Sequence, residues 1–474
     1  MSQPHPLLDA AAQYARQYLD VIGERPVNAT LTSDALRAAL AAPLAEAGDD
    51  PLKVLEALAS AAREGTVATQ GPRYFGFVVG GSLPVATAAD WLVSAWDQNA
   101  GIHVLSPLAA VIESIAADWI RDIVDLPPTW SVGYVTGGHM ANFTALAAAR
   151  HHVLDVVGWD VEADGLFGAP PIEVIVGEQA HYTISTSLRL LGLGSQRVHR
   201  VPIDAQGRML PDELARVLDH TSGPRIVCAQ AGNVNSGAFD PIEAIAEQTS
   251  RHGAWLHVDG AFGLWAAASP SLKHLVNGIA RADSVSTDAH KWLNVPYDCG
   301  IVLCAHPESH RRAMTQAAAY IQETPREREP HEYTPEESRR ARAVPVYAAL
   351  RTLGRSGLRE MVERCCALAR RMAERLATHP AVSILNEVVL NQVLVRISEG
   401  DQQRSDSLTQ AVIARVQADG TCWLSGTIWQ GVAAIRISVS NWSTRADDID
   451  RSADAIIAAI GTAMTGAKPP VGRA

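Results

Sequence analysis

The sequence predicts an α/β protein built on a mostly parallel β-sheet with helices on both faces. Between residues 72 and 330, short apolar runs end in Gly, Asp, His or Asn, and helical segments follow them. Strands that alternate with helices form parallel sheets. The chain has 474 residues, whereas a single core stops growing near ~250–300 residues. We therefore expect a second, smaller lobe.

Residues 1–71 are predicted to form a helical arm. Apolar residues recur at helical spacing in 7–22 and 51–63, and polar, proline-containing links separate the two segments. The first residues lack the basic start and apolar core of a secretory signal, and no run approaches the ~18 apolar residues of a membrane helix. We expect a cytoplasmic protein with no membrane partner.

Residues 72–330 are predicted to form the large α/β domain. Its strand-like runs end in polar or small residues, as in GYVTGGHMAN, IEVIVGEQAH, RIVCAQAGNV and AWLHVDGAFG. In parallel sheets, ligands bind at the carboxyl ends of the strands. The chemistry of this protein is therefore expected at these strand ends.

Residues 331–474 are predicted to form a smaller α+β domain. An arginine-rich helical stretch comes first, the strand-like runs VVLNQVLVRI and AAIRISVS follow, and a last helix is expected near 445–461.

Charge and cysteine spacing exclude several classes of function. The net charge is −11 and basic residues occur only in short runs, which argues against nucleic acid as a partner. The six cysteines form no CxxC or other zinc-ligand spacing, so no metal site is expected.

Asp259 and Lys291 are the first candidate site residues. Asp259 ends one apolar strand, and Lys291 follows the next strand-like run, DSVSTDAH. Lysine is rarely buried unless it is paired or reacting. This pairing suggests pyridoxal phosphate, whose aldehyde binds a lysine as a Schiff base while an aspartate keeps its ring nitrogen protonated. An ordinary Asp–Lys salt bridge explains the two residues equally well.

Two further segments point to the same site. TGGHMAN, residues 136–142, lies between a strand and a helix, where main-chain amides and the helix N-terminus can bind a phosphate. An ordinary strand-to-helix loop has the same appearance. His181 opens a helix after a strand, and a capping or core histidine remains an alternative to a catalytic one.

Taken together, these segments make the chain similar to the group II pyridoxal-phosphate-dependent amino acid decarboxylases, which include aromatic amino acid and glutamate decarboxylases. The resemblance covers nearly the whole chain and includes RYFGFVVGGSLPVATAADWL, SPLAAVIESIAADWI, HVDGAFG, DAHKWLNVPYDCG and YTPEESRRARAVPVYAALRTLGR. It implies the aspartate aminotransferase-like fold of pyridoxal-phosphate transferases, known as fold type I.

The resemblance also assigns roles to single residues. Lys291 would form the Schiff base, Asp259 would contact the pyridine nitrogen, and His181 would stack on the ring. Further cofactor contacts would come from Ala261 on the opposite ring face, Gly137, Gly138 and His139 in the phosphate loop, His290 beside the lysine, and Asn233. Two departures stand out: His139 replaces the Ser or Thr frequent in the family, and Asp288 replaces an Asn. The contact that His139 makes is therefore left open.

Decarboxylation requires a proton donor for the carbon that loses its carboxylate. The resemblance implies a tyrosine on a loop after the lysine, which here is Tyr320, with Tyr333 as the competing candidate. The same cofactor residues would also serve an aminotransferase or an aldehyde-forming lyase, or a non-catalytic cofactor-binding protein. A Rossmann dehydrogenase is disfavoured because TGGHMAN does not supply the GxGxxG turn.

The substrate is expected to be a small L-amino acid. Phe75, Phe77, Ile102 and His103 weakly favour an aromatic or bulky apolar side chain over glutamate, and Arg436 is a candidate contact for a substrate carboxylate. The family works as a homodimer with intertwined arms and an active site at the subunit boundary. The arm, which has no evident core of its own, agrees with a homodimer.

Overall fold

The computed structural model describes residues 5–315 and 327–465. The chain divides into two compact units. The first contains the N-terminal part to Val79, Arg371–Ile384, and the chain from Leu394 on; the second contains Gly80–Arg370 and Leu385–Val393. The boundaries expected from the sequence, 1–71, 72–330 and 331–474, stay a prediction.

The second unit is built around a seven-stranded sheet with the order β1-β7-β6-β5-β4-β2-β3. Within this sheet only β7 runs antiparallel to its neighbours. The strands are β1 Ser131–Val135, β2 Glu173–Gly177, β3 Val198–Val201, β4 Arg225–Gln230, β5 Trp255–Asp259, β6 Ser284–Asp288 and β7 Gly300–Cys304. The predicted mostly parallel sheet is confirmed.

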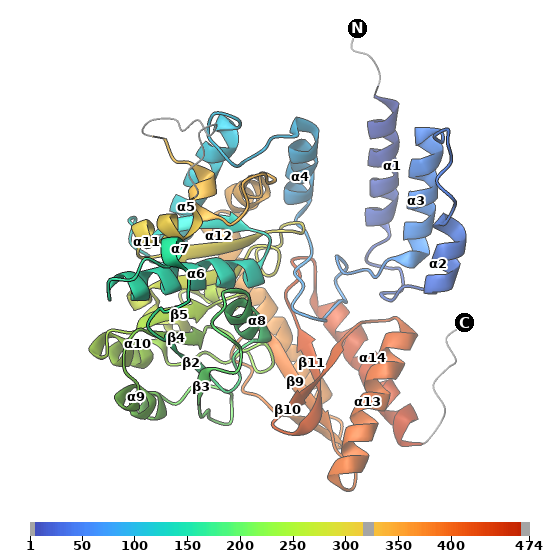
Figure 1. The fold of residues 1–474 in the computed structure, drawn as a ribbon. Helices are drawn as coiled ribbons and strands as arrows, with labels where there is room; N and C mark the ends of the chain where they lie inside the picture. The colour runs from blue at the N-terminus through green and yellow to red at the C-terminus, as the bar shows by residue number, and fades with distance from the viewer. Residues whose placement is uncertain (1–4, 316–326, 466–474) are drawn as a thin grey trace. The chain divides into compact units, whose positions relative to one another are not determined.

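Helices cover both faces of this sheet. The connections β1-α6-β2 and β2-α8-β3 lead along the sheet toward the edge strand β3, whereas β3-α9-β4 and β4-α10-β5 lead back in the opposite direction. Because such crossovers are right-handed, α6 and α8 lie on one face of the sheet and α9 and α10 lie on the other (Figure 1). The helices of this unit are α4 Pro84–Trp96, α5 Pro107–Ile123, α6 Gly138–Asp155, α7 Val161–Asp164, α8 Tyr182–Leu190, α9 Pro211–His220, α10 Ile242–Arg251, α11 Pro307–Met314 and most of α12 Ala343–Leu376. Short 3-10 turns, η1 Gly263–Ala268, η2 Lys273–Val276, η3 Ile279–Arg281 and η4 Pro330–Tyr333, complete it.

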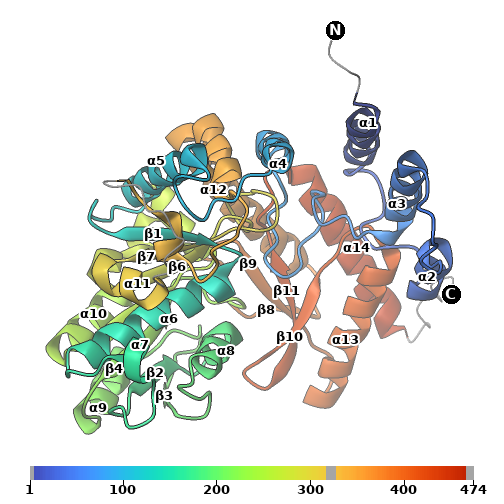
Figure 2. The same cartoon turned by 45° about the horizontal axis from the view of Figure 1, so that its top comes forward.

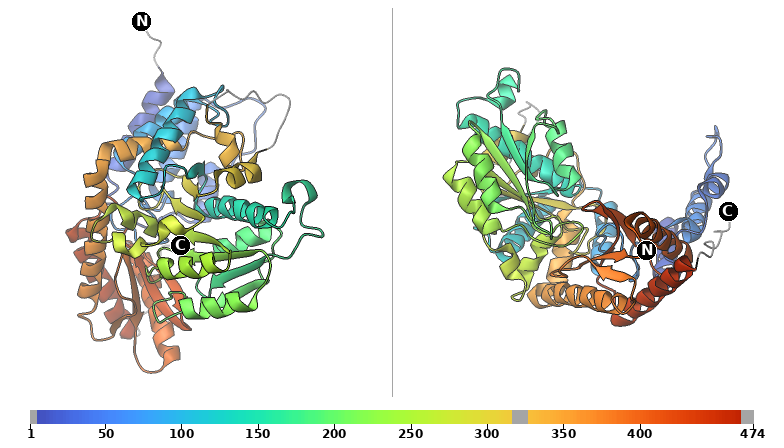
Figure 3. Two further views of the ribbon diagram at one scale, coloured as in Figure 1. Left: turned by 90° about the vertical axis from the view of Figure 1, so that its left-hand side faces the viewer. Right: turned by 90° about the horizontal axis from the view of Figure 1, so that it is seen from below.

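Burial on both faces explains the composition of the central strands. Every residue of β1, β5, β6 and β7 is buried. Helix α6 packs against the sheet with a run of small residues, Ala145 to Ala149, and Leu146 belongs to a core cluster of the unit. Figure 3 shows this layered arrangement from two other sides.

The first unit contains an antiparallel sheet with the order β10-β11-β9-β8. Its elements are β8 Val382–Ile384, β9 Gln392–Ile397, α13 Gln402–Asp419, β10 Ser425–Trp429, β11 Val432–Ser438 and α14 Ala446–Met464. Helix α13 packs against β11 and against α14 (Figure 2). Strands β9 and β11 and helix α14 confirm the two strand-like runs and the last helix expected from the sequence.

The arm contains α1 Pro6–Asp20, α2 Ser33–Leu40 and α3 Pro51–Gly65. Helices α1 and α2 have no buried residue, and the described part of α3 buries only Ala61. Apolar side chains such as Leu8 and Leu58 are more than half exposed. The arm therefore has almost no core of its own, as expected. In residues 5–315 and 327–465, no helix combines the length and apolar character needed to cross a membrane.

Candidate active site

The strand ends of the second unit bring most of the predicted site residues to one edge of the sheet. Strands β1, β2, β4, β5 and β6 point the same way, so the residues that follow them share the carboxyl edge. They are Gly137, Gly138 and His139 after β1, His181 after β2, Asn233 after β4, Asp259 and Ala261 at the end of β5, and His290 and Lys291 after β6.

Lys291 is paired with a carboxylate that the sequence analysis did not assign to it. Its Nζ lies 2.8 Å from Oδ2 of Asp288, whose side chain is only 1% exposed. Burial lowers the pKa of Lys291, but the attraction and hydrogen bond of Asp288, with a smaller contribution from Asp259, more than offset this and raise the pKa overall. The lysine is thus held protonated beside two acidic groups.

Asp288 also connects the lysine to the glycine loop after β1. Its Oδ1 accepts a hydrogen bond from the main-chain N–H of Gly138. A Cβ on Gly138 would lie 2.6 Å from Oδ2 of Asp288, so only glycine allows this approach. A Cβ on Gly80 would collide with the main-chain oxygen of Lys291. Because Gly80 and Gly138 have no side chain, the main chain at these two positions can lie in contact with Lys291 and Asp288.

His290 is held as a neutral side chain in this turn. Its Nδ1 accepts a hydrogen bond from the Cys299 N–H at 3.1 Å, and its Nε2 lies 3.5 Å from Oδ1 of Asp288. Burial lowers the pKa of His290, although Asp288 opposes this shift. Because Nδ1 is an acceptor, the ring proton is on Nε2, facing Asp288.

Asp259 is buried at the end of β5 and accepts two hydrogen bonds. The Ala261 N–H donates to Oδ1 at 3.1 Å, and Nδ2 of Asn142 donates to Oδ2 at 3.1 Å. The Ala261 oxygen in turn accepts from the Asp288 N–H at 2.8 Å, which connects the ends of β5 and β6. Asn142 was not among the predicted site residues.

His181 caps the N-terminus of α8. Its Nδ1 accepts a hydrogen bond from the Thr183 N–H at 3.4 Å and lies 2.8 Å from the Thr183 hydroxyl. The capping alternative is therefore confirmed.

Two buried polar atoms at this edge indicate room for a polar group. In the described part of the chain, neither Nε2 of His139 nor Nδ2 of Asn233 has a hydrogen-bond partner. Buried polar atoms without partners are costly, and a polar ligand bound at this edge would satisfy both of them. With an amine, a carboxylate and a glycine loop at the same edge, this donor set fits pyridoxal phosphate, which offers an aldehyde, a ring nitrogen and a phosphate.

Two predicted residues lie elsewhere, and the position of a third is not described. Tyr320 falls outside the described residues. Tyr333 ends the turn η4, where the Arg328 guanidinium lies 4.7 Å from its ring centre. Arg436 is on β11 of the first unit, where burial lowers its pKa and Tyr74 partly offsets the shift.

Comparison with known proteins finds a family and several relatives. The model of the family described as pyridoxal-dependent decarboxylase conserved domain matches residues 34–398. The aromatic-L-amino-acid decarboxylase of Bacillus atrophaeus is 26% identical over 443 residues, which cover 91% of this chain and 90% of that protein. The cysteine sulfinic acid decarboxylase of Homo sapiens is 28% identical over 352 residues, 72% of this chain and 70% of the relative.

Solved structures share the fold. The structure of Oryza sativa TDC with PLP and tryptamine has a TM-score of 0.91 at 21% identity and covers 98% of this chain and 100% of that one. The fold class expected from the sequence, an α/β pyridoxal-phosphate transferase fold with a smaller C-terminal α+β part, is confirmed.

The ion pair with Asp288 makes a prediction about Lys291. Asp288→Asn removes the negative charge that raises the pKa of Lys291, so a larger fraction of the amine is neutral at a given pH. In cofactor-free protein at pH 8, modification of Lys291 by trinitrobenzenesulfonate should become at least about threefold faster. Peptide mass spectrometry measures the rate, and the half-exposed Lys273 in the same sample is the internal control. If the ratio of the Lys291 rate to the Lys273 rate is the same in Asp288→Asn and in the wild type, Asp288 does not control the charge of Lys291.

Proposed function

The chain belongs to the pyridoxal-dependent decarboxylase family, and on this premise we propose that it decarboxylates an L-amino acid with an aromatic or bulky apolar side chain, through Lys291. It is a lyase that uses pyridoxal phosphate to remove the carboxyl group of an amino acid. The alternatives of an aminotransferase or an aldehyde-forming lyase share the cofactor residues and differ only in product.

The amine of Lys291 beside two carboxylates is the observation that carries this proposal. Bound there, pyridoxal phosphate supplies an electron sink for the carbanion left by the departing carboxylate. Lys291 would provide the covalent attachment, and Asp259 would accept a hydrogen bond from the protonated ring nitrogen and so keep that nitrogen protonated. The glycine loop would bind the phosphate through the main-chain amide of Gly137 and the imidazole of His139, while the Gly138 N–H stays bonded to Asp288.

The ring contacts complete the cofactor site. We assign His181 to one face of the pyridine ring and Ala261 to the other, with Asn233 and His290 at its edges. The ring of His181 is fixed by its hydrogen bonds to Thr183, which pre-organises it for stacking.

An aromatic cluster supports the choice of substrate side chain. In the first unit, the ring of Trp423 stacks on that of Tyr74, with ring centres 5.1 Å apart. The ring centre of Phe77 lies 5.4 Å from that of Trp423. Phe77 and Val78 both have positive φ angles, 53° and 57°, which are strained for such residues. This backbone leaves the Phe77 side chain 60% exposed, although apolar rings are normally buried. Phe77 precedes Gly80, which contacts Lys291, by three residues in the chain.

A direct assay tests the reaction and the substrate class together. Cofactor-loaded protein is incubated with a pool of the common L-amino acids, and mass spectrometry follows amines, aldehydes and keto acids. We expect one amine, formed from an aromatic or bulky apolar amino acid. Aldehydes or keto acids would point to the alternative reactions, and an amine from an acidic amino acid would contradict the proposed specificity.

Lys291→Ala should abolish both amine formation and the visible absorbance of the bound cofactor, because it removes the amine that is proposed to form the covalent link. The matched control is Lys273→Ala, which removes a lysine from the surface of the same unit. Persistence of the visible band in the Lys291 variant would falsify the covalent assignment.

Tyr320 is proposed as the proton donor to the carbon that loses its carboxylate, as the resemblance implies. Tyr320→Phe should decrease the amine and increase aldehyde, peroxide and ammonia, since the unprotonated intermediate is left to react with oxygen. Tyr333→Phe is the control. If the ratio of amine to aldehyde changes only in the Tyr333 variant, the donor is Tyr333 and the Tyr320 assignment is wrong.

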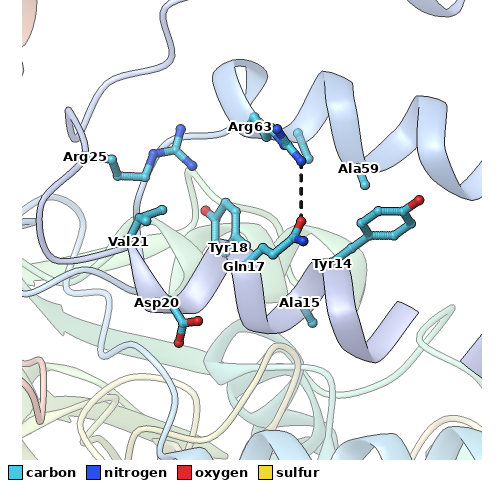
Figure 4. A pocket seen from close by; sticks show the side chains of 10 residues that line it. Tyr14, Ala15, Gln17, Tyr18, Asp20, Val21, Arg25, Ala59 and Arg63 are labelled. Carbon is cyan, nitrogen blue, oxygen red and sulfur yellow. Dashed lines mark hydrogen bonds between the residues drawn. The ribbon is translucent and has the colours of Figure 1, made fainter. Parts of the chain in front are cut away.

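A homodimer with the active site at the subunit boundary is the proposed assembly. The arm supports it, because α1 and α3 expose apolar side chains and bury almost none. A hollow of about 800 Å³ lies between these helices, lined by residues that include Tyr14, Tyr18 and Ala59 (Figure 4). We propose that the arm of a second copy covers this apolar surface.

Substitution of the arm tests the dimer. Leu8→Asp combined with Leu58→Asp places two charges on the exposed apolar surface of α1 and α3 and should convert a dimer into monomers in sedimentation velocity. Phe167→Asp is the control, because Phe167 is 98% exposed on a loop of the second unit. A wild-type monomer at micromolar concentration would refute the proposed assembly.

A further inference from the structure

Asn142 is the centre of a buried side-chain network that the proposed mechanism has not used. It lies on α6, one helical turn after Gly138, and is 1% exposed. Its Nδ2 is 3.1 Å from Oδ2 of Asp259 and 3.2 Å from the Thr183 hydroxyl. Its Oδ1 is 2.9 Å from Nε2 of His257 and also accepts the hydroxyl of Ser286. All four hydrogen-bonding positions of the amide are occupied.

The chemistry of the partners fixes the orientation of this amide. The Asp259 carboxylate can only accept, so the amide nitrogen must face it and the amide oxygen must face His257 and Ser286. His257 therefore carries its proton on Nε2, and its Nδ1 accepts from the Ser284 hydroxyl at 3.0 Å.

The surroundings of His257 hold its ring neutral, with the proton on Nε2. The Ser284 oxygen accepts from Nε1 of Trp255 at 2.9 Å, which leaves its hydroxyl proton for His257. His257 is fully buried, and burial lowers its pKa to about 4, although Asp259 opposes the shift. The ring is neutral at pH 7, so its Nε2 remains a single, fixed donor to Asn142.

The network continues from Asn142 to His181. The Thr183 hydroxyl accepts from Nδ2 of Asn142 and therefore has its own proton available for Nδ1 of His181. Nδ1 also accepts the Thr183 N–H, so it cannot be protonated in this arrangement. The proton of neutral His181 is thus on Nε2.

We propose that Asn142, oriented by His257 and Ser286, is a positioning residue that sets Asp259 and His181 for the cofactor ring. By donating to Asp259, Asn142 keeps that carboxylate in place to accept a hydrogen bond from the protonated ring nitrogen. Through Thr183, Asn142 keeps the His181 proton on Nε2. This inference rests on the proposed role of Asp259 toward pyridoxal phosphate and adds the residues that act through it.

Four single variants distinguish positioning from ordinary core packing. Asn142→Asp retains the shape of the side chain but places an acceptor where Asp259 needs a donor. Thr144→Val is its matched control, because Thr144 is equally buried on α6 and bonds only to the helix main chain. His257→Leu removes the donor to Asn142, whereas in His257→Gln a side-chain amide can still donate. Each variant is prepared without cofactor, and its folded fraction is measured by circular dichroism.

Two readouts report on the cofactor and not on turnover. Titration with pyridoxal phosphate gives its dissociation constant, which should rise about 10- to 100-fold in Asn142→Asp and about 10-fold in His257→Leu, because hydrogen bonds to charged groups are strong. Thr144→Val and His257→Gln should remain within about threefold of wild type. With ¹⁵N-labelled cofactor, the ring-nitrogen resonance should move toward its unprotonated position in Asn142→Asp and His257→Leu. It should stay unchanged in Thr144→Val and His257→Gln.

The outcomes separate this inference from the proposed function. If the wild type forms no covalent complex with pyridoxal phosphate at Lys291, the proposed function fails. If the wild type does and Asn142→Asp retains its affinity and ring-nitrogen resonance, the positioning role is refuted. Equal losses of cofactor affinity in Asn142→Asp and Thr144→Val would assign the effect to helix packing. This result would also refute the positioning role of Asn142. If Asn142→Asp does not fold, the same two readouts are compared between His257→Leu and His257→Gln. Equal cofactor affinity and equal ring-nitrogen resonance in these two variants would overturn the proposal.

Discussion

The buried carboxylate of Asp288 is the constraint on which the site depends. A charge that is 1% exposed must be paired and hydrogen-bonded, because its desolvation is otherwise prohibitive. Asp288 meets this requirement with the amine of Lys291 and the N–H of Gly138. One carboxylate thus connects the end of β6, Lys291 and the glycine loop after β1. This also explains why a lysine can occupy a turn with apolar neighbours.

A second polar cluster lies beside the first and depends on the pairing of β5 with β6. His257 pairs with Ser284 and Asp259 with Ser286 in this parallel register. Side chains two residues apart in a strand share a face, so these four residues and Asp288 lie on the face that α6 covers. Asn142 on α6 provides the amide that bonds to three of them. A slip of one residue between the strands would turn Ser284, Ser286 and Asp288 to the other face of the sheet and remove their contacts with His257 and Asn142.

The two clusters have different chemical consequences. The Asp288 cluster raises the pKa of the Lys291 amine, and the Asp259 cluster positions the carboxylate that is proposed to bond to the ring nitrogen. Both clusters consist of main-chain groups and polar side chains proposed to act on the cofactor, which all members of the family share. This separation agrees with a family in which one scaffold serves relatives named for aromatic amino acids and for cysteine sulfinate.

The sequence by itself determined the mostly parallel sheet, the helical arm and the residues after each strand, because periodicity and strand-end chemistry are local properties. It also indicated Lys291 and Asp259, since charged residues after apolar strands are conspicuous. It did not reveal that Asp288 is the partner of the lysine or that Asn142 bonds to Asp259. The alternation of Trp255, His257 and Asp259 with Ser284, Ser286 and Asp288 was a visible signal of a polar face inside a buried sheet. Only the tertiary structure decided which of these groups meet, because strand order, register and the placement of α6 bring together side chains separated by more than 100 residues.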